Sequence, residues 1–154
     1  MIDRKISARI SLVICIFFAV VLAAMAATFP MFLKGLYFAY HDPSADTMMQ
    51  EVSKAMIPAF YCCLPFAAAA LFMLIRLLLN ILKDDIFILK NVKYLRYISW
   101  CCYAVALITA VFGIKYPLLI IITCSMLIIG TLLRVVKNIM QSAVEIREEN
   151  DLTI

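Results

Sequence analysis

The side chains that could do chemistry occur together at one place, His41-Asp42-Pro43-Ser44. An imidazole, a carboxylate and a hydroxyl are the groups of a Ser-His-Asp triad, which catalyses acyl transfer. Such a triad needs groups that separate elements bring together in a pocket, and three neighbours in one turn do not form it. Pro43 with polar neighbours is typical of a turn. We therefore expect no catalytic residue here and interpret the protein as a non-enzyme.

The cysteines are the other reactive groups, and each lies inside an apolar stretch. They are Cys15, Cys62, Cys63, Cys101, Cys102 and Cys124. None forms a C-x-x-C motif, and the sequence has no H-x-x-x-H pair and no glycine-rich phosphate loop. Adjacent cysteines on a helix point about 100° apart, so the two adjacent pairs do not present their thiols together. We interpret all six as packing residues and expect no metal and no cofactor.

The composition and the spacing of the charges indicate a membrane protein. Of the 154 residues, 66% are hydrophobic and 16% are charged, against roughly 45–50% and 25% in soluble domains. A charge at the bilayer centre is costly, so the spans must lie between charges, at about 10–33, 55–76, 97–114 and 116–134. Each is long enough to cross roughly 30 Å of hydrocarbon as a helix, and none alternates as a barrel strand would. The sequence predicts one domain, residues 1–154: an all-α, four-helix transmembrane bundle in a lipid bilayer.

Lysine and arginine set the expected orientation through the positive-inside rule. Eleven of the fourteen fall before the first span, in the 76–96 loop or after the fourth span, and three fall in the other loops. We therefore expect both termini, and the tail at 135–154, in the cytoplasm. An alternative for the start is a cleaved signal peptide, because Ala24-Met25-Ala26 resembles a signal peptidase site. The apolar run is longer than usual for a signal peptide, which favours a retained helix.

Small residues at four-residue spacing allow membrane helices to approach closely, and three spans carry such stripes. The stripes are Ala19, Ala23 and Ala27; Ala59, Cys63 and Ala67; and Cys102, Ala106 and Ala110. In the fourth span Gly130 offers one close approach, and in the second Pro65 should bend the helix because it cannot donate its backbone bond. The short connection around Lys115 predicts an antiparallel hairpin of the last two spans. A homo-oligomer is compatible with this pattern.

Apart from Arg76 and Arg134 at their ends, the four spans contain no Asp, Glu, His, Lys or Arg. Ion-coupled transporters and intramembrane hydrolases generally need an ionisable group at membrane depth, so this absence argues against both. The hydroxyls of Thr28, Ser99, Thr109, Thr123 and Ser125 can satisfy carbonyls of their own helices. A small oligomeric transporter or channel for an apolar or cationic solute remains the alternative function.

Between the second and third spans, residues 84–96 predict an interfacial amphipathic helix. Ile88, Val92 and Leu95 recur at helical spacing, with Asp84 or Asp85 as the expected cap. The basic residues Lys90, Lys93 and Arg96 would then lie on the polar side. We favour contact with an anionic leaflet over contact with nucleic acid for this segment, and expect no direct nucleic-acid binding.

The fourth helix should extend into the cytoplasm, to about Glu149, because Val136, Met140 and Ala143 keep the periodicity and no Gly or Pro interrupts it. The tail that follows is acidic, whereas the 76–96 loop is mostly basic. We hypothesise that tail and loop face each other, although exposed ion pairs contribute only about 0–1 kcal/mol each.

Two segments on this side carry a family resemblance, Asn91-Val92-Lys93-Tyr94-Leu95-Arg96 and Glu148-Glu149-Asn150-Asp151-Leu152-Thr153-Ile154. With four spans of this spacing, the chain resembles the bacterial domain-of-unknown-function family 2975. Ile86 departs from the proline expected there. The resemblance implies an uncharacterised multi-pass protein of the bacterial plasma (inner) membrane, often encoded beside small helix-turn-helix regulators.

The leading function hypothesis is a non-enzymatic membrane partner or sensor for a cytoplasmic helix-turn-helix transcriptional regulator. It is motivated by the distinctive polar sequence, which lies only on the predicted cytoplasmic face. The candidate contact residues are Asn91, Arg96, Glu149, Asn150 and Asp151.

Overall fold

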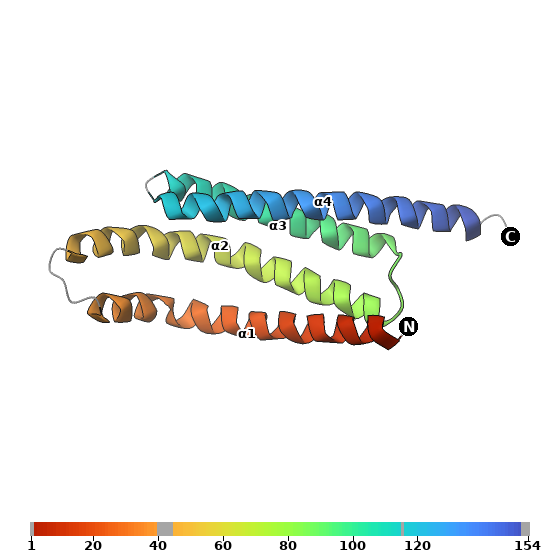
Figure 1. The fold of residues 1–154 in the computed structure, drawn as a ribbon, viewed down its shortest axis with the longest axis horizontal. Helices are drawn as coiled ribbons and strands as arrows, with labels where there is room; N and C mark the ends of the chain where they lie inside the picture. The colour runs from red at the N-terminus through yellow and green to blue at the C-terminus, as the bar shows by residue number, and fades with distance from the viewer. Residues whose placement is uncertain (1, 40–44, 115, 152–154) are drawn as a thin grey trace.

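The protein consists of four long helices in the computed structural model, which describes residues 2–39, 45–114 and 116–151 (Figure 1). The helices are α1 (Ile2–Ala39), α2 (Ala45–Leu82), α3 (Leu89–Gly113) and α4 (Pro117–Asp151). Each contains a segment long and apolar enough to cross a membrane, and the described residues form no strand. The predicted all-α transmembrane fold is confirmed. The turn at His41 lies outside the described residues.

The helices pack side by side in chain order, each antiparallel to the next (Figure 1). In the part of the chain that the structure describes, α1 packs against α2 and against neither α3 nor α4. The bundle is therefore an open row. The end at which α1 begins and α4 ends, called here the terminal end, also carries the α2–α3 turn. The start of α1 and the end of α4 lie on the same side, as expected, and the cytoplasmic location of that side stays a prediction.

The helices run past the predicted span limits. α2 begins at Ala45 and remains helical through Pro58 and Pro65, and Figure 1 shows its axis changing direction between its yellow and green parts, in keeping with the expected bend. α4 continues to Asp151, which confirms the predicted extension of the fourth span. Apolar runs mark the depth of the hydrocarbon, whereas a helix ends only where a capping or breaking residue stops it.

The turn between α2 and α3 is a Schellman motif that closes α2. The amide of Asp85 donates to the Asn80 carbonyl and the amide of Asp84 donates to the Ile81 carbonyl, both at 3.1 Å. Asp84 adopts the left-handed φ of 65° that glycine usually supplies at this position. The expected capping role was wrong, because α3 starts after Ile88 without a side-chain cap. The interfacial segment is also no separate helix, since α3 runs unbroken from Leu89 into the span.

The left-handed backbone at Asp84 leads to a first prediction. We expect Asp84→Ala to be less stable than Asp84→Asn by about 1 kcal/mol, because Asn tolerates this conformation through local hydrogen bonds and Ala does not. Both variants remove the same carboxylate, so its interactions cancel in the comparison. Unfolding of purified protein in mixed detergent and SDS micelles, followed by circular dichroism, measures the difference. Equal stability would show that this position does not need a left-handed residue.

The α3–α4 hairpin is joined by hydroxyl groups. The Ser99 hydroxyl donates to the Gly130 carbonyl at 2.9 Å, and the hydroxyls of Thr109 and Thr123 are 2.9 Å apart. The expectation that the hydroxyls can satisfy carbonyls of their own helices is confirmed for Thr28, Thr109, Thr123 and Ser125, whereas Ser99 donates across the hairpin. In hydrocarbon a hydroxyl has no water as an alternative partner, so bonds between helices hold the hairpin in register.

The small residues have different roles in the three helix contacts. Ala59 and Ala106 are buried, and the side chain of Cys102 lies against Gly130, so these positions do permit close approach. Ala19 and Ala23 instead line a groove between α1 and α2. Many of the large apolar side chains are exposed, as hydrocarbon solvent allows.

Candidate functional site

The structure places the candidate contact residues at the terminal end but does not bring them onto one surface. The side chains of Arg96, Glu149 and Asn150 are exposed, and that of Asp151 lies outside the described side chains. Asn91 is fully buried, with 0% of its surface exposed. The proposal of Asn91 as a contact residue was therefore wrong: its polar atoms face inward and are already bonded.

The Asn91 side chain clamps the α2–α3 turn. Its Nδ2 group donates to the carbonyls of Asp85 at 2.8 Å and Ile86 at 2.9 Å, and its Oδ1 atom accepts from Asn80 Nδ2 at 2.8 Å. Because carbonyl oxygens only accept, the two bonds to carbonyls fix the orientation of the Asn91 amide. Every polar side-chain atom of this amide has a partner, so the last turn of α2 is tied to the first turn of α3.

Asn80 was not identified from the sequence as a residue that needs a partner, although its position in an apolar run indicated it. It is the one polar residue in the run Leu77-Leu78-Leu79-Asn80-Ile81-Leu82. A polar side chain inside such a run must find a partner or reach water, since an unpaired amide in an apolar setting costs several kcal/mol. That partner is Asn91, which could not be assigned without knowing how α2 and α3 pack.

A basic surface borders this clamp on α3. Lys90, Lys93 and Arg96 are exposed, while Val92 and Leu95 on the opposite side of the helix are buried. The predicted separation of the two faces is confirmed. Within the described residues these three cations form no ion pair. They are available to an anionic surface or an acidic segment of a partner.

The end of α4 forms an acidic projection. Val144 is buried at 2% exposure, and every residue from Glu145 to Asn150 is exposed. Figure 1 shows α4 continuing past the α2–α3 turn towards its C-terminal end. Residues 145–151 are called here the α4 arm. The hypothesis that this acidic tail faces the 76–96 loop stays a prediction.

An ion pair joins the start of α1 to the same turn. Lys5 Nζ lies 2.7 Å from a carboxylate oxygen of Asp84, and both side chains are about half exposed, at 42% and 49%. Solvent screens such a pair, which contributes about 0–1 kcal/mol. The pair holds α1 beside the turn but adds little to stability. Among the described side chains, no three of His, Cys, Asp and Glu approach closely enough to hold a metal ion.

A family model described as "Protein of unknown function (DUF2975)" matches residues 37–154. The chain belongs to the DUF2975 family. No curated protein and no solved structure matches it. The DUF2975 match includes the Asn80–Asn91 clamp, the basic surface and the α4 arm, whereas nearly all of α1 precedes it.

Apart from Lys5 of α1, the features described at the terminal end fall within the DUF2975 part of the chain. A hydrogen-bonded turn holds the basic surface of α3 in place, and the acidic α4 arm continues past that turn. Such an arrangement presents charge of both signs to the water phase, which suits recognition of a charged partner. The protein is a multi-pass membrane protein of unknown function by family and fold.

Proposed function

We propose that this protein is a non-enzymatic membrane partner that holds, or senses for, a soluble cytoplasmic protein, with the α4 arm as the docking segment. The carrying observation is that α4 stays helical for residues beyond its last buried side chain, Val144. A helix that buries nothing there gains no stability from tertiary packing. A docked partner would bury this exposed helix and supply the packing that it lacks within the protein.

The side chains of the arm support a protein partner. Glu148 and Glu149 are exposed acids, and the exposed Ile146 adds an apolar side chain, with 60% of its surface accessible. An apolar centre with charged neighbours is the usual make-up of a protein interface. The helix-turn-helix transcriptional regulator implied by the family resemblance is the partner class proposed, and a bacterial plasma membrane is the proposed location.

A second prediction follows from the arm. Full-length protein in nanodiscs should recover a helix-turn-helix regulator from the soluble fraction of its own cells, and deletion of residues 145–154 should abolish that recovery. Glu148→Gln with Glu149→Gln should weaken binding by up to about fivefold per charge, because each exposed pair is worth about 0–1 kcal/mol. Mass spectrometry identifies and quantifies the regulator.

The control variant is Asp46→Asn with Glu51→Gln. It removes the same number of charges near the start of α2, at the end of the bundle away from the α4 arm. This variant should recover as much regulator as the wild type. Equal recovery by all variants, including the deletion, would refute docking on the arm. Flux of a small cation into vesicles containing the purified protein would instead favour the transporter alternative.

A further inference from the structure

α1 and α2 enclose an apolar groove and are in contact at both of its ends. At one end the rings of Phe29 and Phe60 stack with centroids 4.1 Å apart, and the Tyr61 hydroxyl donates to the Ala26 carbonyl at 2.9 Å. At the terminal end the Lys5–Asp84 pair closes the contact. The groove between these contacts has a volume of about 330 Å³.

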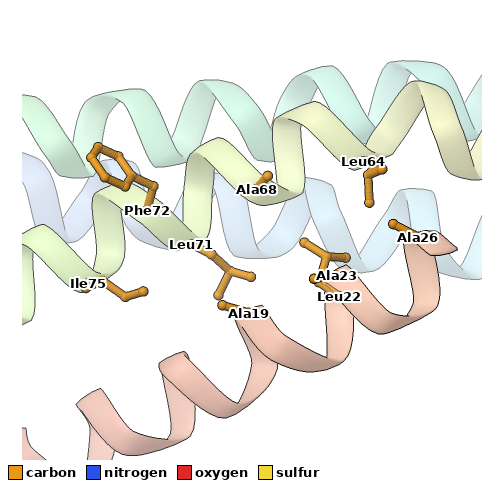
Figure 2. Close-up of a pocket in the computed structure, with 9 residues that line it drawn as sticks. All are labelled: Ala19, Leu22, Ala23, Ala26, Leu64, Ala68, Leu71, Phe72 and Ile75. Atoms are coloured by element: carbon orange, nitrogen blue, oxygen red, sulfur yellow. The ribbon is translucent and has the colours of Figure 1, made fainter.

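The groove is lined by apolar side chains only. Figure 2 shows the small residues Ala19, Ala23 and Ala26 of α1 opposite larger side chains of α2, among them Leu64 and Leu71. The alanines leave the space unfilled, and no other described helix packs on α1 to cover it. An empty groove would forfeit the dispersion contacts of its walls, so in a bilayer a hydrocarbon chain enters it.

The length of the groove matches one leaflet. Its α2 wall runs from Leu64 to Ile75, which at 1.5 Å per residue is about 17 Å. Half of the roughly 30 Å hydrocarbon core is about 15 Å. The wall ends one residue before Arg76, where the second span meets the terminal end. On α2 the groove therefore extends from near mid-membrane to the polar boundary at Arg76, while its α1 wall, residues 19–26, lies around the middle of the first span.

Arg76 provides a charge at the mouth of the groove. Its guanidinium carbon lies 5.3 Å from the ring centroid of Phe72, a wall residue. The side chain is exposed and forms no ion pair with any described residue. A guanidinium fits phosphate oxygens well. Arg9 of α1 and Lys83, which directly follows α2, are also exposed and lie nearer the water, so the local charge favours an anionic headgroup.

From this geometry we infer that the α1–α2 groove is a binding site for one acyl chain of an anionic phospholipid in the leaflet on the Arg76 side. The phosphate binds Arg76, and the chain lies along the alanines of α1. The Phe29–Phe60 stack sets the spacing of the two helices at one end of the groove, and the Lys5–Asp84 pair links the start of α1 to the α2–α3 turn, so the groove is present before the lipid arrives. The predicted orientation makes this the cytoplasmic leaflet.

Quenching of a groove tryptophan by brominated lipids tests the site. Trp100 is the single tryptophan, so Trp100→Phe gives a silent background. Phe72→Trp places the reporter in the groove wall, and Leu107→Trp is the control, at an α3 side chain that is 70% exposed. Each full-length variant is reconstituted in phosphatidylcholine vesicles containing brominated phosphatidylglycerol or brominated phosphatidylcholine.

We expect the groove reporter to prefer phosphatidylglycerol over phosphatidylcholine by about fivefold, as one arginine near an anionic leaflet provides, and the control reporter to show no preference. Arg76→Gln should remove the preference. Arg134→Gln should leave it intact, because it removes an arginine of α4 that lies over the ring of residue 100 of α3 in the wild type. Native mass spectrometry of the wild type and of Arg76→Gln, which keep their aromatic residues, should show a retained phosphatidylglycerol only in the wild type.

Equal quenching of the groove reporter by both lipids would overturn the site. A groove reporter that neither lipid quenches would mean that a second copy of the chain covers the groove, and would also overturn it. Circular dichroism and gel filtration confirm that each compared variant is folded.

Discussion

Asn91→Leu is expected to destabilise the protein by about 2–4 kcal/mol. Leucine has a similar volume but bonds to nothing, so the Asn80 amide and the carbonyls of Asp85 and Ile86 lose their partner. Each buried polar group left unpaired costs about 1–3 kcal/mol, and water entering at the exposed turn recovers part of this. The free energy of unfolding in mixed detergent and SDS micelles measures the loss.

Asn91→Asp separates the role of hydrogen bonding from that of shape. The carboxylate can still accept from Asn80, but it replaces the donor that faces two carbonyl oxygens. We expect a loss at least as large as that of the leucine variant at neutral pH. Asn138 serves as the matched control, because it is exposed on α4 and its side chain accepts only from the neighbouring Lys137. Its leucine and aspartate variants should remain within about 0.5 kcal/mol of wild type. An unchanged stability of Asn91→Asp would refute the clamp.

The helices could be predicted from the sequence because the solvent determines them. Hydrocarbon excludes charge and leaves no partner for backbone groups, so the apolar runs between Arg9 and Lys34 or between Lys54 and Arg76 have to be helical spans. The same reasoning gives no information about helix ends in water. α1 and α2 therefore extend past their predicted span limits, and α3 begins seven residues before Arg96.

The environment of individual polar residues could not be predicted in the same way. Asn91 follows charged residues in a loop, and a polar residue in such a place is expected to face water. It is buried because the Schellman turn brings Asn80 and two carbonyls to one point. Ser99 bonds across to Gly130 because of how α3 and α4 are rotated about their axes. Both outcomes depend on pairs distant in sequence, and a periodicity within one helix does not specify them.

The α1–α2 groove could not be predicted from periodicity within one helix either. The alanine stripe of α1 predicted close packing, but the bulky pair Phe29 and Phe60 sets the spacing of α1 and α2 at one end. A stripe of small residues permits contact without enforcing it. Where larger side chains hold two helices apart, the same residues line a space for lipid.

Gly130→Leu is expected to cost about 1–3 kcal/mol, the usual range for overpacking. A β-carbon at this position would lie 3.0 Å from Tyr103 Cε1 and 3.3 Å from the β-carbon of Cys102. The Tyr103 ring cannot easily move away, because its hydroxyl lies 3.2 Å from that of Thr131 and the guanidinium of Arg134 lies over the ring. The two helices must therefore separate, which also breaks the bond from Ser99 to the Gly130 carbonyl.

Gly35 provides the matched control for this substitution. It is also a helical glycine, and a β-carbon there would meet nothing within 4 Å. Replacing either glycine by leucine improves helix propensity by about 0.8 kcal/mol, so that gain cancels and the comparison isolates packing. We expect Gly35→Leu to be neutral or slightly stabilising, and Gly130→Ala to lose less stability than Gly130→Leu. Trp100 fluorescence should report the separation of α3 and α4, since the Trp100 ring contacts both Tyr103 and Arg134. If both leucine variants unfold at the same SDS fraction, the close approach at Gly130 does not hold the hairpin together.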